Sequence, residues 1–497
     1  MAGIAPVGGG LFLLGISAYV VLGTAGHALA PRDYAAVASL YLLVAITSPG
    51  VFTALEQEVN REVSSRRAAG LGTGAVARGG LLVGAGYAGV VAVVLLAAAP
   101  WLVPRVLGGY RSLLAAAIVA AVGAAAVYLL RGLFAGERRF GWYAASLGLE
   151  GTARLVPCVA LALAGATDPL AYGWAFALGT GIAALACLPG RTSSRSRRWV
   201  DRSPGPAGST TTLGPATSPA SVPIPPAGSA MRERTMSAPA PDGAPRPAGS
   251  TTIRADAMPT PATDGAPVPA GGAAMPDPPI AGKPVEVRAM ARATGLLVVA
   301  SGLTYVVANT APLVLSARLP AAPEVVASFV SLFVLARIPV FLFGPVQAFL
   351  LPTLTAGAER ADLPHLRSRL RVALLAVAAV GVPCALLTAA LGPWAARTFF
   401  GAPLDLPHTA AGLLGAGTVA MLAAQVLQPA LVALRVHRMA TTGWVVGVLA
   451  FGAVLVAPVD PTTAAVTAQL VGPTVVCLVM GVAVATRLRR MVDDPAH

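Results

Sequence analysis

Long stretches without any charged residue alternate along this chain with short connections that are rich in arginine. A membrane-spanning helix needs about 20 consecutive, mostly apolar residues. Eleven charge-free stretches reach about that length: 1–31, 34–55, 79–104, 112–130, 169–190, 293–317, 338–358, 372–396, 406–434, 439–459 and 461–486. A twelfth span is expected over 141–166, and the stretch 338–358 extends back to residue 325 around Arg337. The pattern predicts an all-α integral membrane protein with twelve transmembrane helices.

Residues 191–290 interrupt this pattern with a segment rich in proline, alanine, glycine, serine and threonine. Such a composition cannot bury enough apolar surface to offset the chain entropy lost on folding, so we expect disorder. The segment divides the spans six and six. The predicted organisation is a six-helix lobe over 1–190, a disordered cytoplasmic linker over 191–290 and a second six-helix lobe over 291–497.

The two predicted lobes carry similar sequences at corresponding positions. The stretch "YVVLGTA" (19–25) corresponds to "YVVANTA" (305–311), and "SLYLLVAI" (39–46) corresponds to "SLFVLARI" (331–338). Because six is an even number of spans, both lobes enter the membrane in the same orientation. Parallel repeats of this kind are one of the standard transporter designs.

The charge balance indicates how the chain is oriented in the membrane. Only 11% of the residues are charged, against about 25% in soluble domains. The net charge of +14 comes from arginines, and basic residues favour the cytoplasmic side of membrane spans. Sixteen arginines, with Arg131 among them, fall in the connections of one side and five in those of the other. We therefore predict a multi-pass protein of the cell membrane, with both termini and the linker in the cytoplasm and no nucleic-acid partner.

Several kinds of chemistry find no support in the sequence. The four cysteines lie in apolar spans without a C-x-x-C pair, and the five histidines are scattered, which argues against a metal site. The chain has no G-x-x-x-x-G-K-[ST] loop for nucleotide phosphates. We therefore predict no catalytic residue, no metal and no cofactor, with an ion gradient as the allowed source of energy.

Charges inside the spans are the strongest candidates for a functional site, because a charge at the centre of a bilayer costs about 2.5–3.5 kcal/mol on insertion scales. Arg337 is predicted to lie about twelve residues from either end of its helix, without an acidic neighbour, facing a water-filled cavity. Glu150 and Arg154 lie four residues apart on one helix face and can pair. Their mutual neutralisation in a helix interface is the equally weighted alternative.

Three uncharged or terminal positions are weaker candidates for the cavity lining: Asn309, Gln347 and Glu56. A hydrogen bond between helices is the more common role for a membrane asparagine such as Asn309. Glu56 begins the cytoplasmic end of the second predicted span, where solvation also explains it.

The repeat, the opening "GLFLLGISAYVVLGTAGHAL" and the pattern "ARIPVFLFGPVQAFLLPTLT" resemble the polysaccharide-biosynthesis flippases of the multidrug/oligosaccharidyl-lipid/polysaccharide (MOP) exporter superfamily. This resemblance covers everything except the linker. It implies a MATE-like fold, with two six-helix repeats around a central cavity. It also implies translocation of an undecaprenyl-diphosphate-linked oligosaccharide for cell-surface polysaccharide assembly, by alternating access of the two lobes.

Within this interpretation, Arg337 and then Arg154 would contact the diphosphate, because a guanidinium offers planar donors to phosphate oxygens. Glu150 would hold Arg154 or couple transport to an ion. The implied partners are the lipid-linked sugar diphosphate, membrane lipids, and glycosyltransferases or a polymerase of the same pathway.

Three alternatives remain open at the level of sequence. A multidrug or cation antiporter of the same superfamily would have acidic residues in its cavity. A major-facilitator transporter also has six plus six spans, but its usual loop after the second span is replaced here by "EQEVNREVSSRRAAG". A membrane glycosyltransferase or ligase would need an acidic pair or a large external loop, and we predict that the chain is not an enzyme.

Overall fold

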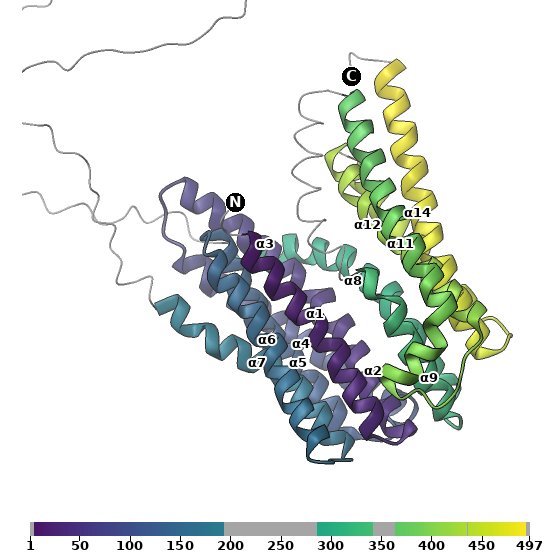
Figure 1. Ribbon diagram of the computed structural model, residues 1–497. Helices are drawn as coiled ribbons and strands as arrows, with labels where there is room; N and C mark the ends of the chain where they lie inside the picture. Colours follow the sequence, from purple (N-terminus) through teal and green to yellow (C-terminus); the bar gives the residue numbers. More distant parts are fainter. Residues whose placement is uncertain (1–3, 193–285, 341–362, 435, 494–497) are drawn as a thin grey trace, which may run out of the picture. The chain divides into compact units, whose positions relative to one another are not determined.

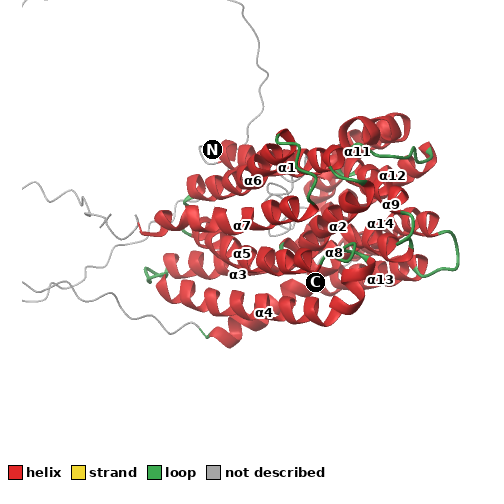
Figure 2. Ribbon diagram, turned by 90° about the horizontal axis from the view of Figure 1, so that it is seen from below, coloured by secondary structure: helices red, strands yellow, loops and turns green. Residues whose placement is uncertain are grey.

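The computed structural model describes residues 4–192, 286–340, 363–434 and 436–493, and all of the regular secondary structure in these ranges is α-helical (Figure 2). Twelve helical segments in this part of the chain are long and apolar enough to cross a membrane. The predicted fold class is therefore confirmed. The predicted linker lies almost entirely outside the described residues, so the lobe boundaries at 190 and 291 stay predictions.

Residues 4–192 form seven helices, because the second span is interrupted. They are α1 (Ile4–Ala28), α2 (Pro31–Thr47), α3 (Pro49–Ala68), α4 (Gly74–Arg105), α5 (Arg111–Gly136), α6 (Phe140–Leu163) and α7 (Pro169–Thr192). The interruption falls at Ser48, directly before Pro49. Ser48 itself keeps right-handed helical dihedral angles. Pro49 has no N–H to donate to the carbonyl of Ala45 in the preceding turn, which explains why α2 and α3 are separate helices within one span.

The described helices of the second half are α8 (Val287–Arg318), α9 (Pro323–Ala336), α11 (Leu363–Phe400), α12 (His408–Ala433), α13 (His437–Leu455) and α14 (Pro461–Asp493). Each half is stabilised mainly by contacts among its own helices. In the first half α1 packs on α6, and α5 packs on α3 and α7. In the second half α12 packs on α11 and α14, and α13 packs on α14. The helices are coloured in chain order in Figure 1.

Arg337 lies at an interruption of its span. α9 ends at Ala336, Arg337 forms a turn, and residues 338–340 are helical again. Its backbone N–H bonds to the Val334 carbonyl oxygen at 3.1 Å, the tight bond that often closes a helix. Pro339 explains this end, because it has no N–H to donate to the preceding turn. The span after residue 340 lies outside the described residues, so the predicted mid-span position of Arg337 stays a prediction; the described part places its side chain at a turn that follows α9.

The two halves of the chain meet along several helices. α2 packs on α8 and α9, α3 and α4 pack on α8, and α1 packs on α11. Two buried hydroxyl pairs join the halves, Tyr34 with Ser331 and Ser39 with Ser316, each with oxygens 3.2 Å apart. Both halves belong to one compact unit that comprises Met1–Arg197 and Pro278–His497.

The contact between α1 and the end of α11 has no room for a side chain. A Cβ atom on Gly26 would overlap the Phe400 carbonyl oxygen, and one on Gly23 would lie 2.6 Å from the Phe399 carbonyl oxygen. Real Cβ atoms do not approach other atoms this closely, so the backbones would have to separate. Gly401 completes the contact with a φ of +63°, a conformation that favours glycine.

We expect the substitution Gly26→Val to separate α1 from the end of α11, because its side chain would occupy the position of the Phe400 carbonyl. The distance between spin labels attached at Ala30 and Leu404, in a chain without its native cysteines, should increase and broaden. Gly8→Val on the same helix is the matched control, since a Cβ at Gly8 meets nothing within 4 Å. An unchanged distance distribution for Gly26→Val would contradict this account of the contact.

Candidate functional site

Five charged side chains line one cavity of about 410 Å³ inside the helical unit. They are Glu56 on α3, Arg131 on α5, Glu150 and Arg154 on α6, and Arg337 after α9. Asn309 on α8 also lines it. The structure thus brings together every described residue that the sequence singled out for the site, while Gln347 lies outside the described residues. What each residue does remains a prediction.

Glu150 is held between two arginines. Its carboxylate accepts a hydrogen bond from Arg131 and forms an ion pair with Arg154, each with an N–O distance of 2.6 Å. The Thr180 hydroxyl on α7 lies 3.4 Å from the same carboxylate. All three charged side chains are at most 13% exposed. The predicted pairing of Glu150 with Arg154 is therefore present, as one half of a buried arginine–glutamate–arginine cluster.

The sequence analysis did not predict that Arg131 lines the cavity. It was counted among the arginines of the cytoplasmic connections, but α5 continues to Gly136 and Arg131 is only 2% exposed. The apolar Leu133 and Phe134 that follow it are the signal that the helix continues. Gly132 also contributes, because a Cβ at that position would lie 2.7 Å from the Glu56 carbonyl oxygen. This close approach of α5 to α3 brings Arg131 next to Glu56.

Arg337 has no carboxylate partner among the described residues. Its guanidinium donates to the Ala308 carbonyl oxygen, lies 3.4 Å from Asn309 Oδ1 and sits 5.0 Å from the centre of the Phe333 ring. The Ala308 carbonyl is available because Pro312, four residues later in α8, has no N–H to satisfy it. The guanidinium is thus held by neutral groups, and its positive charge stays uncompensated within its immediate surroundings.

Glu56 differs from Glu150 in its surroundings. The Tyr143 hydroxyl donates to Glu56 Oε1 at 2.8 Å. In the described part of the chain, Glu56 forms no ion pair, although Arg131 and Glu150 are close enough to act on it electrostatically. The second predicted span therefore carries an acidic side chain into the cavity, rather than only into solvent at its end.

Aromatic hydroxyls make up much of the remaining polar lining. Five tyrosines contribute: Tyr19, Tyr41, Tyr128, Tyr143 and Tyr305. The three arginines of the cavity exceed its two glutamates by one positive charge when all are ionised. This is an anion-favouring balance in a space bounded by apolar helices, where charge interactions are stronger than in water.

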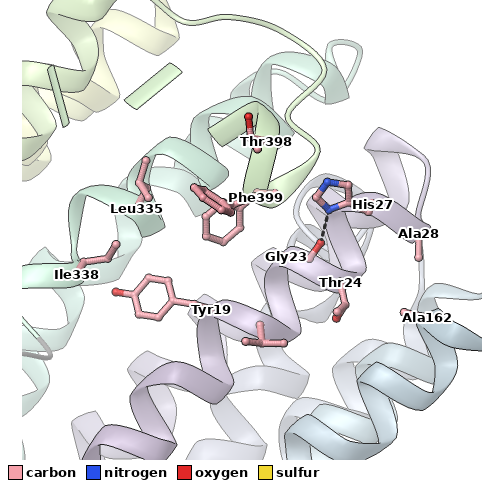
Figure 3. Close-up of a pocket in the computed structure, with 12 residues that line it drawn as sticks. Tyr19, Gly23, Thr24, His27, Ala28, Ala162, Leu335, Ile338, Thr398 and Phe399 are labelled. Atoms are coloured by element: carbon pink, nitrogen blue, oxygen red, sulfur yellow. Dashed lines mark hydrogen bonds between the residues drawn. The ribbon is translucent and has the colours of Figure 1, made fainter. Parts of the chain in front are cut away.

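A second hollow, of about 690 Å³, is lined mainly by apolar groups from α1, α9 and α11 (Figure 3). None of its lining residues is an aspartate, glutamate, lysine or arginine. The His27 ring on α1 bonds to the Gly23 carbonyl within its own helix, at 2.8 Å. Tyr19 borders both this hollow and the charged cavity. Elsewhere in the described residues, no group of histidine, cysteine, aspartate and glutamate side chains could hold a metal ion.

We expect Glu150→Gln to lower the free energy of unfolding by about 3–5 kcal/mol, because two buried guanidiniums would lose their shared counter-charge. The measurement is thermal unfolding in detergent. The matched control is Asp405→Asn, since Asp405 and its partner Arg397 have side chains that are 49% and 58% exposed; its effect should stay below about 1 kcal/mol. Equal melting temperatures for the two variants would show that the cluster does not stabilise the protein.

The fold was compared with known proteins. No protein-family model matches the sequence, and no curated protein matches it. Solved structures do match. One is described as the inward-facing conformation of a multidrug resistance MATE family transporter of the MOP superfamily; it aligns with a TM-score of 0.64 at 12% identity, over 99% of this chain and 96% of its own.

Two further structures align over nearly the whole chain. The eukaryotic MATE transporter AtDTX14 has a TM-score of 0.60 at 12% identity, over 98% of this chain and 97% of its own. A MOP superfamily transporter from Pyrococcus furiosus, for which a reverse polarity of the binding pocket suggests a different function, has a TM-score of 0.57 at 13% identity, over 98% and 96%. Identities this low establish the fold only. This chain therefore has the twelve-span fold of the MATE transporters of the MOP superfamily.

Proposed function

We propose that this protein moves a lipid-linked oligosaccharide, joined to its lipid through a diphosphate, across the cell membrane for cell-surface polysaccharide assembly. The observation that carries the proposal is Arg337, a guanidinium with no carboxylate partner in the described structure, in a cavity with an excess of positive charge. Such a charge is expensive inside a membrane protein unless something negative offsets it during the working cycle.

The chemistry of the cargo suits this cavity. A sugar diphosphate linked to a lipid carries two negative charges on a hydrated head that cannot cross hydrocarbon unaided. Arg337 offers it planar guanidinium donors. Arg154 is the second contact, because its Nε has no hydrogen-bond partner in the described structure although Glu150 holds its Nη2. The tyrosine hydroxyls of the cavity offer hydrogen bonds that replace part of the hydration shell of the head group.

The fold supplies the movement. Parallel six-helix repeats that share a central site move by rocking of one repeat against the other. In this chain, such rocking would break the contact of α1 with α11 and the two hydroxyl pairs between the halves. The orientation with both termini and the linker in the cytoplasm is part of the proposal, as are glycosyltransferases or a polymerase of the same pathway as partners.

A multidrug or cation antiporter is the second candidate. Glu56 and the five tyrosines favour it, because a carboxylate and aromatic rings together attract organic cations. The excess of arginine in the same cavity opposes it. One fold hosts several functions, and the transporter described with a pocket of reverse polarity supports assigning function from the charge of the cavity. The structural neighbours are transporters, which also disfavours a glycosyltransferase or ligase.

Arg337→Ala should reduce translocation of a lipid-diphosphate-linked oligosaccharide in reconstituted vesicles by about ten- to a hundredfold, the usual value of a hydrogen bond to a charged group. Arg337→Lys should recover only part of this, because an ammonium lacks the planar fork of donors. The measurement is the fraction of labelled sugar that becomes accessible outside the vesicle. Arg397→Ala is the matched control, since Arg397 is 58% exposed and pairs with Asp405 at 2.8 Å.

The same vesicles distinguish the two candidate functions. Organic-cation efflux by the unmodified protein, without any translocation of the lipid-linked sugar, would overturn the proposal in favour of the antiporter. Full translocation by Arg337→Ala would show that Arg337 does not contact the cargo.

Pro312→Ala tests how Arg337 is held. The alanine N–H would bond to the Ala308 carbonyl within α8 and compete with the guanidinium for that acceptor. We expect translocation to fall by less than for Arg337→Ala and the apparent affinity for the cargo to change, as measured by the cargo concentration at half-maximal rate. An unaltered concentration dependence would show that this carbonyl does not position Arg337.

A further inference from the structure

The two carboxylates of the cavity, Glu150 and Glu56, differ in the charge and number of their partners. Glu150 forms ion pairs with two arginines at 2.6 Å and is close to the Thr180 hydroxyl, so its ionised form is compensated and fixed. Glu56 accepts one bond, from the neutral Tyr143 hydroxyl at 2.8 Å, and it is half-buried where it lines the cavity. A carboxyl with one neutral donor and access to a water-sized space can change its protonation state without breaking an ion pair.

We propose that Glu56 is a proton-binding site linked to the binding of the anionic cargo, so that a proton and the diphosphate head enter the cavity together. This inference rests on the proposed function and deepens it by naming the ion and the residue that binds it. It also assigns the coupling role to Glu56 rather than to Glu150, which becomes the fixed counter-ion of Arg131 and Arg154.

The groups that surround Glu56 support a reversible protonation. Arg131 and Tyr128 approach it from α5, Tyr143 and Glu150 from α6, and Tyr305 from α8. Arg131 is the only cation in this described set, and it is already bonded to Glu150. The ionised Glu56 therefore has no full counter-charge of its own, and the protonated carboxyl keeps an acceptor for the Tyr143 hydroxyl.

Charge balance determines the sign of the linkage. With Glu56 ionised, the three arginines and two glutamates of the cavity leave one positive charge; with Glu56 protonated, they leave two. A diphosphate esterified at both ends retains two negative charges, both on strongly acidic groups. Protonation of Glu56 thus matches the cavity to its cargo, and loss of the proton weakens the complex. The proton would also reduce the charge that crosses the membrane with each head from two to one.

The experiment measures binding and proton uptake together. The full-length protein in nanodiscs is titrated with a polyprenyl diphosphate that carries one N-acetylhexosamine, whose own charge does not change between about pH 5 and pH 8. We expect the protein to bind it about tenfold more tightly at the lower end of this range and to take up close to one proton from a weakly buffered solution near its upper end.

Two variants on α3 form the comparison. Glu56→Gln keeps the shape of the side chain and imitates the protonated carboxyl, so it should bind with the high affinity seen at low pH, at every pH, and take up no proton. Glu58→Gln carries the same change two residues away, where Glu58 pairs with Arg61 at 2.7 Å outside the cavity. It should keep the pH dependence of the unmodified protein.

A third variant keeps the test decisive if Glu56→Gln does not fold. Tyr143→Phe removes the hydroxyl that stabilises the ionised carboxylate, so the midpoint of the pH dependence should move to higher pH. A pH dependence that persists in Glu56→Gln, or a midpoint that stays in place in Tyr143→Phe, would overturn the role of Glu56 and leave the proposed function intact. Absence of any binding by the unmodified protein would overturn the proposed function itself.

Discussion

The buried cluster of Arg131, Glu150 and Arg154 is the constraint on which the rest of the cavity depends. Its members lie on α5 and α6, and Thr180 extends it to α7. In a low-dielectric interior, a carboxylate between two guanidiniums leaves one positive charge without a partner. The first half of the protein therefore places a positive charge beside the cavity while keeping its helices joined through direct hydrogen bonds.

Arg337 provides the positive charge that the second half contributes to the cavity, and different interactions hold it in place. Its guanidinium is positioned by a backbone carbonyl, an amide oxygen and an aromatic ring rather than by a carboxylate. The carbonyl comes from Ala308 because Pro312 removes its usual helical partner. Pro312 thus leaves a carbonyl oxygen free to position the guanidinium, and this oxygen does not neutralise its charge. In the proposed function, this arrangement would keep a charge available to an anionic head group. Glu56, with its single neutral donor, is the group that we propose adjusts the balance by protonation.

The spans and their number could be predicted from sequence because hydrocarbon length and the absence of charge are local properties. The candidates Arg337, Arg154, Glu150, Asn309 and Glu56 were also found this way, since a charge or an amide inside an apolar stretch stands out. Arg131 was missed because it directly follows the charge-free stretch 112–130 and looked like a residue of the connection. The exact position of the turn at Arg337 was not predicted, because the apolar pattern continues past Pro339.

By itself, the sequence predicted twelve helices long and apolar enough to cross a membrane, and it located several charges within them. Only the tertiary structure decided which charges neutralise one another. Glu150 could have paired with Arg154 alone, but the close approach of α5 gives it Arg131 as well, and the fold leaves Arg337 with neutral partners. The physical reason is that hydrophobicity acts residue by residue along the chain, whereas an ion pair depends on the distance between atoms of different helices.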